Sequence, residues 1–140
     1  MLEGRLPSFS SNVDLVDLNA SGNALSGTIP SLLNLEQLQR LDLSNNQLTD
    51  TLPDLSHLPN LTELRLDSNL LSHSDFDVTT SPNLEVIEIE WNQLTFQDLF
   101  DINGLGLLIF NYAPQRPIVL PDSICATIGD NVIIDLIVDQ

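Results

Sequence analysis

Ionisable residues recur in this chain at a constant spacing. Asp42, Arg65 and Glu88 follow one another at intervals of 23 residues. Asp67 lies two residues after Arg65, and Glu90 lies two residues after Glu88. If these positions stand in register, Asp42, Arg65 and Glu88 form a row of ion pairs, while Asp67 and Glu90 place like charges side by side. This arrangement can attract a charged ligand, and it contains no acid–base pair for proton transfer.

Catalytic and metal-binding sets are missing from the sequence. His57 and His73 have no acid–base partner set, and Cys125 is the only cysteine. One thiol can form neither an intrachain disulfide nor a thiolate metal site. Three carboxylates on flat strands supply too few oxygen ligands for Ca²⁺, which takes ~6–8. We therefore expect no enzymatic activity, no metal and no cofactor.

The ionisable positions belong to a repeated unit of the form L-x-x-L-x-L-x-x-N-x-L. Successive units begin 23 residues apart, at Leu15, Leu38, Leu61, Leu84 and Leu107. A fixed period between ~20 and ~29 residues with this apolar spacing is the mark of a solenoid, in which each repeat contacts only its neighbours. A solenoid forms an extended surface on which a ligand can bind, so the pattern favours a binding function over a catalytic one.

Each repeat is predicted to contain one short strand. Side chains alternate between the two faces of a strand, so Leu41 and Leu43 point inward while Arg40, Asp42 and Ser44 point outward. Segments that contain Pro30 or Pro53 return the chain, and we expect turns there because proline lacks an N–H and fixes φ. The expected ligand-binding residues lie on the outward face: Arg40, Asp42, Arg65, Asp67, Glu88, Glu90 and Trp91.

One asparagine follows the strand in each of four repeats: Asn23, Asn46, Asn69 and Asn92. An asparagine side chain both donates and accepts hydrogen bonds, so a stacked column can satisfy the backbone groups of the turns. We interpret these asparagines as a structural ladder and not as ligand contacts.

The repeats resemble leucine-rich repeats of the plant type, because residues 25–35, LSGTIPSLLNL, look like the L-x-G-x-I-P form with the leucines that follow it in that type. The resemblance implies a β-rich α/β solenoid: a right-handed superhelix with a parallel β-sheet on its concave side and mostly non-helical convex returns. It also implies an extracellular or cell-surface location and binding of a protein, peptide or glycan, usually through the concave side.

The sequence suggests two units. Residues 2–7 share the L-x-G-x-I/L-P form of residues 25–30, so the predicted solenoid of residues 1–115 begins in the middle of a repeat, without an N-terminal cap. The chain then resembles a fragment with an open core edge, and we expect it to self-associate or to be marginally stable. Residues 116–140 are predicted to be a linker or the start of a truncated β-sandwich, because residues 110–115 and the strand pattern at 132–139 resemble bacterial surface proteins with an immunoglobulin-like domain after the repeats.

The net charge and the hydropathy of the chain argue against nucleic acid and membranes as partners. The 140 residues include 20 acidic and 4 basic ones, for a net charge of −16. Such a surface repels nucleic acid and anionic membranes. No signal peptide is visible, and no apolar run approaches the ~20 residues of a transmembrane helix.

The sequence therefore favours a non-enzymatic interaction module of a secreted or surface-exposed protein, of a bacterial type, that binds a protein or glycan through the concave acidic face. Two alternatives stay open. The chain can be the ligand-binding part of a receptor-like ectodomain, which a transmembrane helix and signalling domain should follow. It can also be the targeting arm of a surface hydrolase with a catalytic domain elsewhere.

Overall fold

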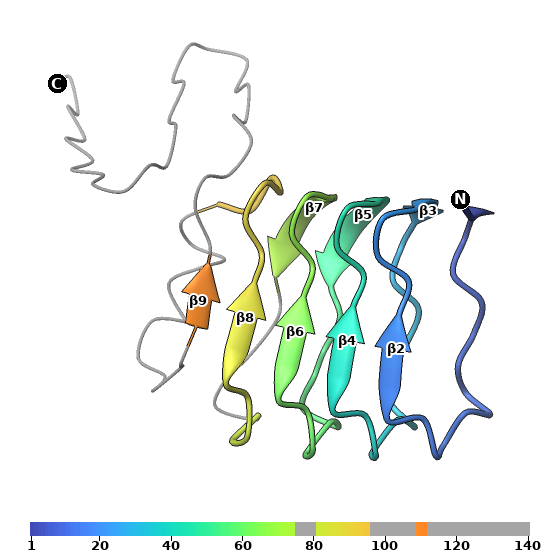
Figure 1. Cartoon of the computed structure of the whole chain (residues 1–140), viewed down its shortest axis with the longest axis vertical. Coiled ribbons are helices and arrows are strands. Elements are labelled where there is room, and N and C mark those ends of the chain that lie inside the picture. Colours follow the sequence, from blue (N-terminus) through green and yellow to red (C-terminus); the bar gives the residue numbers. More distant parts are fainter. Residues whose placement is uncertain (75–80, 96–108, 112–140) are drawn as a thin grey trace, which may run out of the picture.

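The structure is a computed structural model, and it describes residues 1–74, 81–95 and 109–111. Within these residues the chain forms parallel strands joined by turns and bends, without a helix. The strands stack coil upon coil into two sheets on different sides of the molecule (Figure 1). The prediction of a β-rich solenoid with non-helical returns is therefore confirmed for the described coils.

The first sheet contains the strands that the repeat pattern predicts. Its order is β2 (Asp17–Asn19), β4 (Arg40–Asp42), β6 (Glu63–Arg65), β8 (Val86–Glu88) and β9 (Ile109–Asn111). All neighbouring pairs are parallel, and each residue faces the one 23 positions further along the chain. The sequence period is thus the register of the sheet.

A second parallel sheet was not predicted. It contains β1 (Glu3–Gly4), β3 (Ala24–Gly27), β5 (Gln47–Leu52) and β7 (Leu70–Ser74), in that order. These strands occupy part of the chain that the sequence assigned to turns. Leu25, Leu48 and Leu71, at most 5% exposed, point inward from them. A short alternation around one leucine is too weak a strand signal to stand out in a single sequence.

Leucine layers between the two sheets form the core. Leu41 and Leu43 are 1% and 0% exposed, as the alternation predicts, and the equivalent Leu64 and Leu66 are fully buried. Ser44 lies beside the outward-facing Asp42, and its hydroxyl donates to Asp42 Oδ1 at 2.7 Å, although the residue is buried.

The asparagine amides connect neighbouring coils. Asn46 Nδ2 donates to the carbonyls of Ala20, Leu43 and Ser44 at 3.0–3.1 Å, and its Oδ1 accepts from Leu25 N at 3.0 Å. Asn69 and Asn92 repeat this set one and two coils later. Each amide satisfies backbone groups that have no partner in a regular strand ladder.

The predicted second unit at residues 116–140 and Cys125 lie outside the described residues, so that prediction stays open. In the part of the chain that the structure describes, no helix has the length and apolar character to cross a membrane.

Candidate functional site

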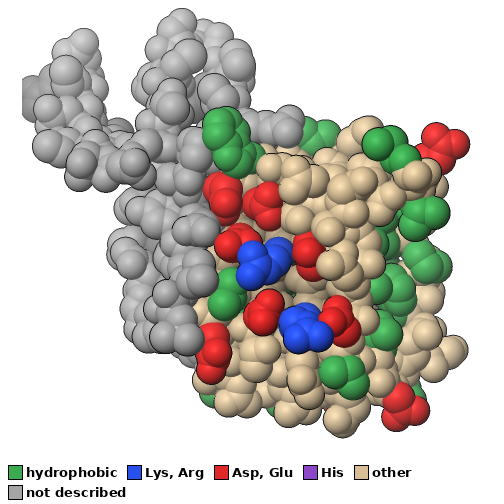
Figure 2. Space-filling view, viewed as in Figure 1, with side chains coloured by type: hydrophobic (Ala, Val, Ile, Leu, Met, Phe, Trp, Pro, Cys, Tyr) green, Lys and Arg blue, Asp and Glu red, His purple; other side chains and the backbone are tan. Residues whose placement is uncertain are grey.

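Charged side chains gather on the outer face of the first sheet, the face opposite its buried leucines. Figure 2 shows acidic side chains surrounding two basic ones at the centre of this face. The basic residues that the first sheet contributes are Arg40 in β4 and Arg65 in β6. The strands position them because residues 23 apart face each other across neighbouring strands.

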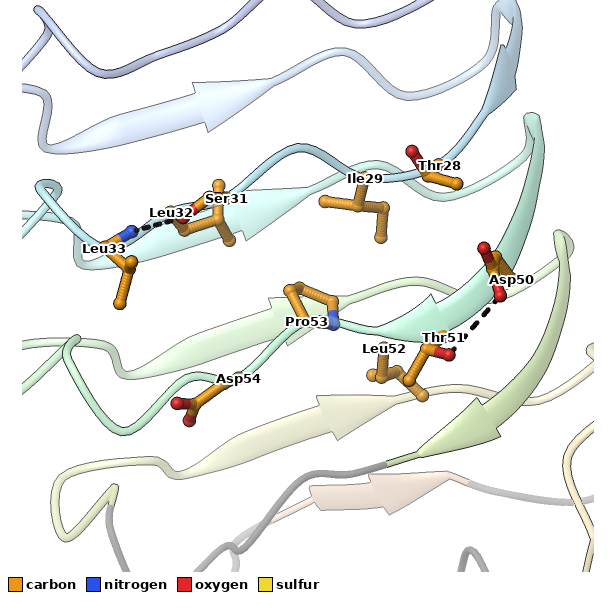
Figure 3. Close-up of a pocket in the computed structure, with 10 residues that line it drawn as sticks. All are labelled: Thr28, Ile29, Ser31, Leu32, Leu33, Asp50, Thr51, Leu52, Pro53 and Asp54. Carbon is orange, nitrogen blue, oxygen red and sulfur yellow. Dashed lines mark hydrogen bonds between the residues drawn. The ribbon is translucent and has the colours of Figure 1, made fainter.

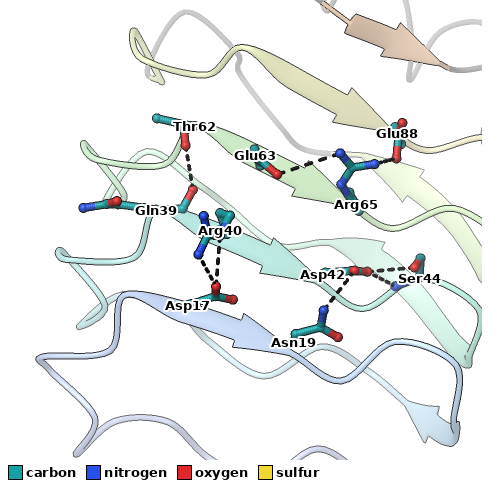
Figure 4. Close-up of polar contacts among 10 residues, drawn as sticks. All are labelled: Asp17, Asn19, Gln39, Arg40, Asp42, Ser44, Thr62, Glu63, Arg65 and Glu88. Carbon is teal, nitrogen blue, oxygen red and sulfur yellow. Dashed lines mark hydrogen bonds and ion pairs between the residues drawn. The ribbon is translucent and has the colours of Figure 1, made fainter.

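Each arginine is held by acidic residues on its own or neighbouring strands (Figure 4). Arg40 Nη2 and Nε donate to Asp17 Oδ2 at 2.5 and 2.9 Å. Arg65 Nη1 donates to Glu88 Oε2, and Arg65 Nη2 lies 3.8 Å from Glu63 Oε2. The Arg40–Asp17 pair thus lies at the start of β4 and β2, and the Arg65–Glu88 pair lies at the end of β6 and β8.

The structure does not contain the complete row of ion pairs expected from Asp42, Arg65 and Glu88. The Arg65–Glu88 pair is present, whereas Asp42 accepts hydrogen bonds from Asn19 Nδ2 at 3.3 Å and from Ser44 N at 3.1 Å. Arg65 reaches Glu63 on its own strand instead of Asp42. The row was only partly predicted, because alignment of columns does not determine which of several neighbouring carboxylates a guanidinium selects.

Asp17 and Glu63 were missing from the predicted set. They align with Arg40 at the same 23-residue spacing, so the repeat itself could have revealed them. Together with Asn19, Leu41 and Asp42, these residues and the two arginines line a small hollow of about 100 Å³. The hollow is smaller than the ~300–1,000 Å³ of typical small-molecule sites. It can hold a few water molecules or one side-chain end group.

The carboxylates of Asp67 and Glu90 form an uncompensated part of the same face. No ion pair joins either of them to a basic side chain within the described residues. Burial is the main cause that raises the pKa of Asp67 and of Glu90, and the neighbouring acidic charges raise both further. Glu90 Oε2 is buried and, among the residues described, has no hydrogen-bond partner. Burial therefore disfavours the charged form of both carboxylates.

Trp91 lies directly beside this pair and is 51% exposed. Its φ is 56°, in the left-handed region, where Gly22 (65°), Asn45 (55°) and Ser68 (56°) occupy the equivalent position of earlier coils. Bulky residues rarely adopt this conformation. A large apolar side chain is thus half exposed on a backbone conformation that favours glycine or asparagine.

The described residues contain no group of three or more His, Cys, Asp and Glu side chains arranged to hold a metal. His57 is exposed in the segment after β5, and His73 is exposed in β7, where its Nδ1 contacts the hydroxyl of its neighbour Ser72 at 2.9 Å. The residues brought together on the first sheet are suited to recognising a ligand by charge and by aromatic contact.

Two family models match the chain. The model described as "Leucine Rich Repeat" matches residues 14–35, and "Leucine Rich repeats (2 copies)" matches residues 36–78. No curated protein matches the sequence.

Solved structures with the same fold are ectodomains of plant receptors. The ectodomain of the Arabidopsis receptor kinase HAESA, in complex with an extended IDA peptide hormone, is 32% identical over 81% of this chain, with a TM-score of 0.70. The ectodomain of GASSHO1/SCHENGEN3 from Arabidopsis thaliana, in complex with CASPARIAN STRIP INTEGRITY FACTOR 2, is 34% identical over 69%, with a TM-score of 0.64. The plant peptide hormone receptor RGFR1, in complex with RGF2, is 34% identical over 66%, with a TM-score of 0.62.

This chain spans only a small part of those proteins: 20% of the HAESA chain, 12% of the GASSHO1/SCHENGEN3 chain and 15% of the RGFR1 chain. The similarity therefore concerns a few coils of a much longer solenoid.

Proposed function

Since residues 14–78 are leucine-rich repeats, we propose that the chain is a non-enzymatic interaction module that binds a protein, peptide or glycan outside the cell through the outer face of its first sheet. The binding residues are Arg40, Asp42, Arg65, Asp67, Glu88, Glu90 and Trp91. Leucine-rich-repeat ectodomains with protein or peptide partners among the similar structures support a proteinaceous ligand.

Trp91 is the observation that carries this proposal. It is 51% exposed in a left-handed backbone conformation, and a non-glycine residue there costs on the order of 1–2 kcal/mol. An exposed tryptophan next to polar groups is typical of binding hot spots, where burial of its side chain against a partner stabilises the complex. Asp67 and Glu90 beside it add a charge that a cationic group of the ligand can neutralise.

Replacement of Trp91 by asparagine tests the proposal. Asparagine tolerates the left-handed region, so Trp91→Asn should leave the free energy of unfolding unchanged or raise it by up to ~1 kcal/mol. Peptides selected from a random display library on the wild-type chain should bind the variant at least ~10-fold more weakly, by fluorescence anisotropy, as expected for a hot spot.

Glu36→Gln provides the matched control, because it changes an exposed charge that lies outside the strands of the first sheet and outside the predicted set of binding residues. This variant should bind the selected peptides as the wild type does. Equal affinity of Trp91→Asn and wild type would refute the assignment of the site, and a glycan array on the same variants separates a carbohydrate ligand from a peptide.

A receptor-like ectodomain is the second candidate, and the three receptor structures favour it. The two proposals differ in the domains that come after the repeats in the full-length protein. A transmembrane helix and a signalling domain downstream in the coding frame support the receptor. An immunoglobulin-like domain with a surface anchor supports an adhesion protein, and a catalytic domain supports the targeting arm of a surface hydrolase.

A further inference from the structure

A second hollow lies away from the outer face of the first sheet, between the coil that follows β3 and the end of β5. Its volume is about 520 Å³, within the range of ligand-binding pockets. Figure 3 shows the lining residues in two rows, one from each coil. They are Thr28, Ile29, Ser31, Leu32, Leu33, Asp50, Thr51, Leu52, Pro53 and Asp54.

The groove opens because two neighbouring strands separate. β3 pairs with β5 only as far as Gly27 and Leu48, whereas β5 pairs with β7 up to Leu52 and Ser74. No backbone hydrogen bond joins residues 28–31 to residues 50–54, all of which the structure describes. Among the described residues, the edge of β5 that faces the groove is therefore unpaired from Asp50 onward. Unpaired strand edges accept an added extended segment by main-chain hydrogen bonding.

The side chains of the groove combine an apolar centre with acidic ends. Ile29 and Leu52 lie at its centre and are buried in the core, 8% and 1% exposed, whereas Leu33 at one end is 51% exposed (Figure 3). Asp54 lies toward the same end as Leu33, and Asp50 lies at the other end. Hydrogen bonds from the backbone and side chain of Ser56 lower the pKa of Asp54, which keeps this carboxylate ionised. No lining residue is basic.

We propose that this groove is a second docking surface, which binds an extended segment of a protein partner that carries basic side chains alternating with apolar ones. The unpaired edge of β5 binds the main chain, the exposed Leu33 contacts an apolar side chain, and Asp50 and Asp54 attract the basic ones. A second copy of this chain is a poor occupant. It has four basic residues, of which Arg40 and Arg65 are ion-paired and Arg5 packs beside Gly27.

The test uses nuclear magnetic resonance of the whole ¹⁵N-labelled chain with two short acetylated and amidated peptides as probes. One probe is Lys-Leu-Lys-Leu-Lys and the other is Glu-Leu-Glu-Leu-Glu. At ~150 mM NaCl, where the screening length is ~8 Å, the basic probe should give saturable shifts in the amides of Thr28, Leu33, Thr51 and Leu52. The acidic probe should give none. Shifts spread evenly over the acidic surface, or restricted to the first sheet, would overturn the proposal.

Variants separate this groove from the face around Trp91. The double variant Leu33→Ser with Asp50→Asn should weaken the groove response roughly 10-fold, because it removes the apolar contact and one charge. Asparagine is chosen at position 50 because φ there is 76°. Trp91→Asn and Glu36→Gln should leave the groove response unchanged. An unchanged titration of the double variant, or loss of the groove response in Trp91→Asn, would overturn the assignment.

Discussion

At the residue scale, the asparagine ladder shows how one side chain per coil satisfies a turn. The amide of Asn69 is fully buried and reaches three carbonyls and one backbone N–H, while Asn23, at the first coil, is only half-buried. The same residue type therefore does more for stability in the middle of the stack than at its end. A single sequence shows the spacing but not this difference.

Asn46→Ala should lower the free energy of unfolding by ~1–3 kcal/mol, since it leaves buried backbone groups without partners. Urea denaturation monitored by circular dichroism measures the change. Gln47→Ala, at the exposed neighbouring position, is the control and should change the free energy by less than ~0.5 kcal/mol. An unchanged midpoint for Asn46→Ala would disprove the structural role of the ladder.

Glu90 and Asp54 should affect the pH dependence of stability with opposite signs. The folded-state pKa of Glu90 lies above its ordinary value of 4.5. Its contribution to folding stability is therefore most favourable below pH 4.5 and is lost as pH rises through the folded-state pKa. The folded-state pKa of Asp54 lies below 3.8, so its contribution is present above that value and is lost as pH falls through the folded-state pKa.

Glu90→Gln should therefore be more stable than the wild type at neutral pH, with the difference shrinking as pH falls toward 4.5. Asp54→Asn should be less stable than the wild type at neutral pH, with its difference shrinking below pH 3.8. Thermal unfolding of the wild type and the two variants, from neutral pH to below pH 3.8, measures both differences in stability. The same sign for the two variants would contradict the assigned causes, namely burial for Glu90 and hydrogen bonds from Ser56 for Asp54.

At the scale of elements, a left-handed residue recurs in the second sheet at Gly4, Gly27 and Asp50, with φ of 96°, 78° and 76°. The glycine position of the L-x-G-x-I-P form thus requires a positive φ, and in the third coil Asp50 occupies this position. At Gly27 a Cβ atom would also lie 3.3 Å from the Arg5 side chain. Glycine is needed there for its backbone conformation, whereas the exposed Arg5 side chain could shift to make room for a Cβ atom.

Gly27→Ala should destabilise the chain by about 1 kcal/mol or more, because the native φ is incompatible with a side chain. Asp50→Gly should be neutral or stabilising, since the left-handed strain of aspartate is relieved. Chemical denaturation of both variants provides the comparison. If alanine at position 27 were tolerated and glycine at position 50 were harmful, the backbone argument would be wrong.

At the scale of the whole molecule, stability is expected to be a sum over neighbouring coils. Leu64 is fully buried in β6, which pairs with strands on both sides, whereas Leu18 is half-buried in β2, which within the described chain pairs only with β4. Equivalent leucines therefore have different surroundings.

Leu64→Ala should cost ~2–5 kcal/mol, the usual range for a leucine in a closed core, and Leu18→Ala distinctly less. Urea denaturation of the two variants tests the gradient, and amide hydrogen exchange of the wild type should show β2 opening before β6. Equal losses for the two variants would mean that the solenoid unfolds as one unit, without a weaker end.

The sequence by itself determined the stacked coils, the register of the first sheet, the buried leucines and the outward columns. All of these follow from local alternation and a constant period, because each coil contacts only the next. Trp91 and the acidic columns could be placed for the same reason. Only the tertiary structure decided that Arg65 also pairs with Glu63 and not with Asp42, that Ser44 is buried and that a second sheet forms. It also decided where β3 and β5 separate. These features depend on how side chains and backbones of different coils compete for the same partners, and no periodicity within one coil encodes that competition.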